Sequence, residues 1–211
     1  VPFISRIDSV INWLQLPEDI RPKLVLLYFS EPDHTGHTMG TNGSDIIKTI
    51  SEMDTLLGYL LKKLEDLPIY SNLNIFILSD HGMTDVSSKR MIVLDDYISR
   101  MDALYIRGRG SHVQFDIKEE YKEYENIFIK ELTNIPKCKY WKKNNIPTRF
   151  HFQNNNTNDY LLLANEGWLI TTLSDHHDKP FTIKGMHGYD PSIVNMHGIF
   201  YAKGVDIKDA A

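Results

Sequence analysis

The fold is indicated most clearly by the stretch Asn74-Ile75-Phe76-Ile77-Leu78-Ser79-Asp80-His81-Gly82. Its first five residues, Asn74–Leu78, form a short apolar run of strand length, which predicts a buried strand. A polar turn with an adjacent carboxylate and imidazole follows where this strand ends. Open α/β sheets bind ligands outside the carboxyl ends of their strands, so we expect a site at this edge.

The residues before this stretch repeat the pattern. Lys23–Phe29 (Lys-Leu-Val-Leu-Leu-Tyr-Phe) is a second apolar run, which predicts a strand buried on both faces, and a polar loop, Ser30–Gly43, follows it. Apolar residues then recur at spacings of three and four between Ile46 and Leu64, as in an amphipathic helix. Ser44 is the expected N-cap of this helix and Pro68 its stop.

The remainder of the chain predicts shorter elements. We expect strands near Met91–Leu94, Leu104–Arg107 and His112–Ile117, a helix from Glu119 to about Asn134, a strand pair Tyr160–Ala164 with Trp168–Thr172, and a last strand Ile199–Ala202. The Asn-rich stretch Gln153–Asn158 is a predicted loop tip. Alternation of strands and helices favours an α/β sandwich with a largely parallel sheet.

Composition narrows the class of protein. The chain has 211 residues, 42% of them hydrophobic, which suits one domain with one sizeable core. Its 23 basic and 28 acidic residues give a formal charge of −5, which argues against a nucleic-acid-binding module. The single cysteine, Cys138, excludes an internal disulfide and a cysteine-based zinc site; we expect a half-buried thiol.

Three separate clusters carry candidate metal ligands. Asp33 and His37 lie in Glu31-Pro32-Asp33-His34-Thr35-Gly36-His37, Asp80 and His81 follow the strand Asn74–Leu78, and His187 lies in Gly185-Met186-His187-Gly188-Tyr189-Asp190. Each cluster alone has an ordinary structural interpretation, such as a carboxylate that caps a helix or a turn with a packed histidine. Together, two carboxylates and three imidazoles would provide most of a two-metal site that clamps the oxygens of a displacement at phosphorus.

A fourth cluster of Asp and His residues resembles a set of metal ligands, but we do not interpret it as a metal site. Asp175-His176-His177-Asp178 lies in a polar stretch bounded by proline, and we predict a solvated loop there. Two glycosylation sequons, Asn42-Gly43-Ser44 and Asn155-Asn156-Thr157, are compatible with secretion.

The order Asp-x-x-x-His, Asp-His and a distant His resembles that of the alkaline phosphatase superfamily. The wording of the motifs resembles its ectonucleotide pyrophosphatase/phosphodiesterase family, especially the small eukaryotic cell-surface members. The matching segments are Trp13–Pro17, Tyr28–Asp33, Gly36-His37, Ser79–Met83, Ile146–Phe150, Glu166–Trp168, Gly188–Asp190 and Met196-His197. The chain departs from the family pattern at Thr41 and Pro191, neither of which is a candidate ligand.

This resemblance implies an alkaline-phosphatase-like three-layer α/β/α sandwich, with residues 1–211 as the C-terminal part of a single phosphodiesterase catalytic domain. It implies two Zn²⁺ ions, one held by Asp33, His37 and His187, the other by Asp80 and His81 with an aspartate N-terminal to this chain. The family's threonine nucleophile is also expected there, so that no catalytic nucleophile lies in the chain itself.

The implied activity is hydrolysis of phosphodiester or pyrophosphate bonds in a nucleotide or dinucleotide, at the cell surface or outside the cell, with any membrane anchor outside this chain. Choline-phosphate esters are an alternative substrate class. Two further alternatives stay open: another superfamily hydrolase, such as a phosphomonoesterase, phosphonate hydrolase or sulfatase, and a zinc-binding pseudoenzyme with a binding role.

Overall fold

The computed structural model describes residues 1–178 and 180–208, and the chain divides into two compact units. The first comprises Val1–Thr35, Asn42–Asp80 and Ile199–Ala211, and the second Gly36–Thr41 and His81–Gly198. Helix α2 (Asp33–Met39) crosses the boundary between them. The elements are those of a mixed α/β protein, as the alternating pattern predicted.

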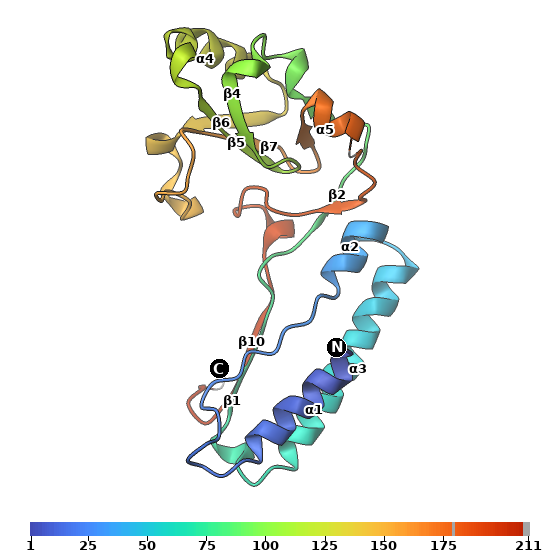
Figure 1. Ribbon diagram of the computed structural model, residues 1–211. Coiled ribbons are helices and arrows are strands. Elements are labelled where there is room, and N and C mark those ends of the chain that lie inside the picture. Colours follow the sequence, from blue (N-terminus) through green and yellow to red (C-terminus); the bar gives the residue numbers. More distant parts are fainter. Residues whose placement is uncertain (179, 209–211) are drawn as a thin grey trace. The chain divides into compact units, whose positions relative to one another are not determined.

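Two helices build the core of the first unit. Helix α1 (Phe3–Leu14), which the sequence analysis did not predict, lies alongside α3 (Ser44–Glu65) (Figure 1). The two bury Ile7 and Ile11 of α1 against Leu64. Helix α3 confirms the predicted amphipathic helix, with one correction: Gly43 is its N-cap and Ser44 its first residue.

A two-stranded ladder completes the first unit. Strands β1 (Asn74–Leu78) and β10 (Phe200–Gly204) pair antiparallel, which confirms that both segments are strands. The predicted burial of Asn74–Leu78 is wrong, because Phe76 and Leu78 are exposed. The stretch 23–29 is extended but forms no strand in the described part of the chain, so that prediction is wrong. Its alternate residues Leu27 and Phe29 pack against the helices. Leu24 and Leu26 are 77% and 88% exposed, so the run is not buried on both faces.

A four-stranded antiparallel sheet forms the centre of the second unit (Figure 1). Its order is β4 (Leu104–Arg107), β5 (His112–Ile117), β7 (Tyr160–Ala164) and β6 (Cys138–Lys142). Phe128 and Leu132 of helix α4 (Glu125–Asn134) are buried in the same core as Phe115 of β5. The 3₁₀ helix η4 (Glu119–Tyr124) leads into α4, so the predicted single helix is two shorter ones.

Two smaller pairings complete the sheets, and the strand pairs taken together correct the prediction of a largely parallel sheet. Strand β3 (Met91–Val93) pairs parallel with β8 (Leu169–Thr171), and β2 (Thr84–Asp85) pairs antiparallel with β9 (Gly185–Met186). Within the described residues β3–β8 is the one parallel pair. The predicted partnership of β7 with β8 is therefore wrong: β7 lies between β5 and β6. The other elements are α5 (Leu173–Asp178) and the 3₁₀ helices Tyr70–Asn72, Leu94–Asp96, Met101–Ala103, Lys143–Asn145, Thr148–Phe150 and Val194–Met196.

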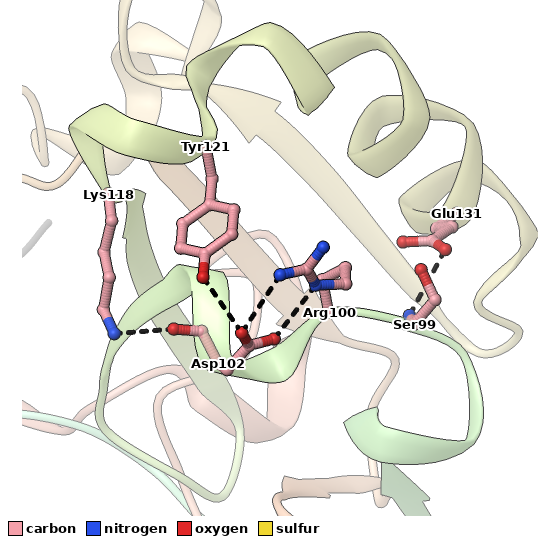
Figure 2. Close-up of polar contacts among 6 residues, drawn as sticks. All are labelled: Ser99, Arg100, Asp102, Lys118, Tyr121 and Glu131. Atoms are coloured by element: carbon pink, nitrogen blue, oxygen red, sulfur yellow. Dashed lines mark hydrogen bonds and ion pairs between the residues drawn. The ribbon is translucent and has the colours of Figure 1, made fainter.

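A polar network fixes the connection between β5 and α4. Asp102 accepts hydrogen bonds from Arg100 and from the Tyr121 hydroxyl at 3.2 Å, and Lys118 donates to its backbone carbonyl at 2.6 Å (Figure 2). On the same side, Glu131 of α4 accepts from the backbone of Ser99 at 3.2 Å. The hydrogen bond from Arg100 holds the pKa of Asp102 below its ordinary value. The network is exposed, so its effect is to order loops rather than to build a buried site.

Candidate metal centre

Helix α2 carries the first two candidate ligands. The sequence pattern predicted a loop for Asp33 and His37, but they lie at the two ends of one turn of this helix. Residues four apart share a helix face, so the continuous helix itself sets the carboxylate beside the imidazole. Helical spacing therefore brings the two side chains together, where the sequence predicted a polar loop.

The ladder between β2 and β9 brings two distant parts of the chain together. Thr84 pairs with Met186, so the residue before β2 lies opposite His187, which follows β9. The ring of His81 stacks on that of His187, with centroids 3.5 Å apart and planes 12° apart. Two histidines separated by more than a hundred residues in the sequence thus become neighbours through a short antiparallel pairing.

The imidazoles of His37 and His187 face each other. Their Nε2 atoms are 3.1 Å apart. Two nitrogens bound to one tetrahedral zinc at about 2.0–2.1 Å would be about 3.3 Å apart, so this spacing fits a shared ion. Asp33, His37 and His187 each offer one ligand atom within 4.8 Å of the others, and all three residues are half-buried. This set is a candidate metal site.

Backbone carbonyls orient two of these rings. The Nδ1 of His37 lies 2.8 Å from the Gly185 carbonyl oxygen, and the Nδ1 of His81 lies 2.8 Å from that of Gly82. A carbonyl oxygen only accepts, so each Nδ1 carries the proton and each neutral ring keeps its lone pair on Nε2. Such outer hydrogen bonds are the usual way in which a metal-binding histidine is held in its ligand tautomer.

Close backbone contacts hold α2 against β9. The backbone N–H of Lys184 donates to the His37 carbonyl at 2.7 Å. A Cβ built on Gly185 would lie 2.4 Å from the carbonyl oxygen of Gly36, a distance that no real side chain tolerates. Glycine at position 185 is therefore required for the approach that brings His37 to His187.

The loop after His187 is fixed at three successive residues. Gly188 has φ +81°, and its Cα faces the buried Ser111. Tyr189 is 4% exposed and donates from its hydroxyl to the Trp168 carbonyl at 2.9 Å. Burial raises the pKa of Tyr189, so this hydroxyl keeps its proton.

Asp190 is the third anchor. It accepts hydrogen bonds from the backbone and hydroxyl of Ser192, at 3.0 and 2.8 Å, and pairs with Arg149. Burial alone would raise the pKa of Asp190, but these bonds outweigh it and the pKa is lowered. The motif Gly188-Tyr189-Asp190 thus serves to hold the position of the histidine that precedes it.

The remaining candidates lie as follows. Asp80 follows β1, is exposed and precedes His81 directly, and neither residue is in the set of three. His176, expected in a solvated loop, lies half-buried in the short helix α5. Asp85 was not predicted to contribute to the site. It accepts hydrogen bonds from the backbone and hydroxyl of Thr41 at 2.6 and 2.9 Å and so ties the end of α2 to β2. No sequence pattern marked Asp85.

Comparison with known proteins identifies the family. A family model described as type I phosphodiesterase/nucleotide pyrophosphatase matches residues 1–190. The chain belongs to this family. It is 34% identical over 206 residues to human ectonucleotide pyrophosphatase/phosphodiesterase family member 5, and covers 41% of that protein. It is 31% identical over 212 residues to venom phosphodiesterase 2 of Crotalus adamanteus, and covers 26% of it. Each match includes 97% of this chain.

Solved structures show the same likeness. Murine ectonucleotide pyrophosphatase/phosphodiesterase 5 matches 97% of the chain with a TM-score of 0.85 and 32% identity. An inactive variant of that murine protein in complex with AMP matches with a TM-score of 0.84 and 33% identity. The chain spans 53% and 52% of these two solved chains, that is, about half their length. In the part of the chain that the structure describes, no helix combines the length and the apolar character needed to cross a bilayer.

Proposed function

We propose that this chain is part of a zinc-dependent hydrolase of phosphodiester or pyrophosphate bonds in nucleotides. The observation that carries the proposal is the meeting of His37 and His187, 3.1 Å apart at Nε2, in a chain of this family. The AMP complex of the murine relative supports a nucleotide as the substrate class. Relatives named as ectoenzymes or venom enzymes support a place at the cell surface or outside the cell.

The proposed metal ligands are those of the sequence analysis. Asp33, His37 and His187 would hold one Zn²⁺, and Asp80 and His81 a second, together with an aspartate N-terminal to Val1. Oxygen and imidazole donors in this combination suit zinc. Bound zinc would polarise the phosphoryl oxygens and lower the pKa of the attacking oxygen.

The chain's own residues would position these donors. The hydrogen bonds to the carbonyls of Gly185 and Gly82 favour the tautomers of His37 and His81 in which Nε2 could bind a metal ion. The nucleophile in this proposal is a threonine N-terminal to Val1, and residues 1–211 are the C-terminal part of one catalytic domain of the alkaline-phosphatase-like, three-layer type. Five donors and no nucleophile would leave the chain inactive alone.

A pair of variants in the full-length protein tests the proposal. Asp80→Asn should remove nearly all turnover of a nitrophenyl nucleotide diester, because it removes a donor of the proposed second ion. His176→Ala, in helix α5, is the matched control and should stay within a few-fold of wild type. Elemental analysis of protein purified without a chelator should find two zinc ions per chain.

The outcomes separate the alternatives. Magnesium or calcium without zinc would refute the ligand assignment. Faster cleavage of a nitrophenyl monoester than of the diester would favour a phosphomonoesterase. Two bound zinc ions without hydrolysis of either ester would favour a pseudoenzyme.

A further inference from the structure

Met83 packs against the backbone that precedes two of the three candidate histidines, His37 and His187. It follows His81 by two residues in the sequence. A Cβ built on Gly36, the residue before His37, would lie 2.5 Å from the Met83 sulfur. A Cβ built on Gly185, two residues before His187, would lie 2.6 Å from the same sulfur. The thioether of Met83 therefore packs against both glycines, and Met83 itself belongs to the segment that contains the third histidine, His81.

These contacts have a geometric consequence. Gly36 and Gly185 have no side chains with which to set the distance between α2 and β9. One backbone hydrogen bond, from Lys184 to the His37 carbonyl, and the bond between the His37 ring and the Gly185 carbonyl join the two segments. The sulfur of Met83 fills the space that the two glycines share. Methionine is unbranched and polarisable, and it suits an irregular gap of this kind. Loss of the thioether would leave a cavity, and the surrounding segments would relax toward it.

From these contacts we infer that Met83 is a positioning residue for the metal centre: its thioether sets the spacing of the His37, His81 and His187 segments and thereby the affinity for zinc. The inference rests on the proposed function, since it concerns the same site. Met83 offers no ligand atom to the set of three; it acts through the backbone of Gly36 and Gly185. Residues that orient metal ligands typically change metal affinity by about 10–100-fold when removed.

Zinc binding to the full-length protein tests the inference without reference to turnover. The apo protein is titrated with Zn²⁺ in competition with a chromophoric chelator, and with Co²⁺, whose visible absorption reports the symmetry of its ligands. Met83→Ala should weaken zinc binding about 10–100-fold and change the cobalt spectrum. Met83→Leu keeps the volume and should stay within about threefold of wild type.

A core methionine of the same unit provides the matched control. Met91 lies in β3 and packs against the main core, away from both glycines in the sequence. Met91→Ala should lower the melting temperature of the chelator-treated protein at least as much as Met83→Ala does. It should leave zinc affinity within about threefold, because its cavity lies in the core rather than between α2 and β9.

A double variant makes the test specific to the contact. Gly36→Ala alone places a methyl group 2.5 Å from the Met83 sulfur and should weaken zinc binding. Apart from the backbone of α2 and the neighbouring residues, the atoms of the described residues that this methyl group would meet within 4 Å belong to Met83. In Gly36→Ala/Met83→Ala the methyl therefore enters the gap left by the thioether, and the double variant should bind zinc more tightly than either single variant.

The results decide between distinct failures. A wild-type protein that binds no zinc would refute the proposed function. If Met83→Ala binds zinc as tightly as the wild-type protein does, the inference is refuted and the proposed function is not. The inference is also refuted if Met91→Ala weakens zinc binding as much as Met83→Ala does. It is refuted as well if the loss of zinc affinity in the double variant is the sum of the losses in the two single variants. Should Met83→Ala not fold, the double variant, which refills part of the cavity, takes its place in the comparison with Gly36→Ala.

Discussion

At the scale of single residues, Cys138 shows how burial sets reactivity. Its thiol is half-buried, as the sequence analysis predicted, and lies 3.6 Å from the Ile135 carbonyl. Burial raises its pKa to about 11. At pH 8 about one thiol in a thousand is then ionised, whereas an unfolded cysteine with a pKa of about 8.5 is about one quarter ionised. Because the thiolate is the nucleophile, the folded thiol should react at least 100-fold more slowly with a disulfide reagent.

This reactivity is measured with an aromatic disulfide reagent at pH 8, in buffer and in concentrated guanidinium. One thiol per chain should react within seconds in guanidinium and slowly in buffer. Equal rates in the two solutions would show that the burial of Cys138 is not maintained.

The residue types in the sequence predicted the candidate donors of the site. The backbone contacts that position these donors could not be predicted from the sequence. The five donors could be chosen because Asp and His fell at strand ends or beside glycine. The structure brings the imidazoles of His37, His81 and His187 together; that they bind zinc stays a prediction. The carbonyl of Gly185 and the thioether of Met83 could not be chosen, because close approach of two glycines depends on segments about 150 residues apart.

At the scale of elements, Glu125 joins the start of α4 to the central sheet. It accepts hydrogen bonds from the hydroxyl of the buried Tyr160 in β7 and from Lys142 in β6, the latter at 2.9 Å. The Tyr160 hydrogen bond, followed by that of Lys142, lowers the pKa of Glu125. A carboxylate with a folded pKa below its unfolded value stabilises the fold above the unfolded pKa. This stabilisation is lost as the pH falls through the folded pKa.

Glu125→Gln should therefore lower the melting temperature at pH 7 by about 2–3 °C, a modest shift because Glu125 is largely solvated. The difference from wild type should shrink as the pH falls through the lowered pKa of Glu125. Glu123→Gln, an exposed neighbour on η4, is the control and should change little at any pH. Thermal scans by circular dichroism between pH 3 and 7 measure both. A difference that grows toward low pH would contradict the assigned sign.

Helices and strands were predicted correctly where the spacing of apolar residues in the sequence agreed with the packing in the structure. The strands β1, β4, β5 and β7 and the helix α3 satisfy this condition. Helix α1 was missed although Ile7, Val10, Ile11 and Leu14 form a stripe with helical spacing. For Lys23–Phe29 the apolar run was correct and the inferred burial was wrong, because only its alternate residues find partners among the described residues.

At the scale of the whole molecule, metal should couple the site to folding. Asp33 and His187 are far apart in sequence, so an ion that they share would close a long loop and bind only the folded state. Free zinc at about 100 times its dissociation constant adds about 2.7 kcal/mol to stability. Chelation of the full-length protein should lower its melting temperature by about 5–10 °C. Zinc readdition is the control, and an unchanged melting curve after confirmed metal removal would count against a shared site.

The first unit leads to the last prediction, which concerns the isolated 211-residue chain. One side of its extended segments is apolar and exposed: Leu26 is 88% exposed, Phe76 53% and Leu78 65%. Exposed apolar strands of this kind promote association. The chain covers about half of the solved relatives, and in the full-length protein we expect the rest of the domain to cover this face. The isolated chain should therefore aggregate, bind a fluorescent apolar dye and hydrolyse no nucleotide diester.

One substitution distinguishes an open face from a covered one. Leu26→Lys should make the isolated chain more soluble, because it places a charge on the exposed face. In the full-length protein the same change should bury that charge and lower the melting temperature by about 5–10 °C. Val194→Lys, 76% exposed in the second unit, is the control and should change neither property much. Light scattering and thermal melts of both forms measure the effects. A full-length protein that tolerates Leu26→Lys unchanged would show that this face stays open to solvent, and a soluble, active isolated chain would show that the nucleophile lies within residues 1–211.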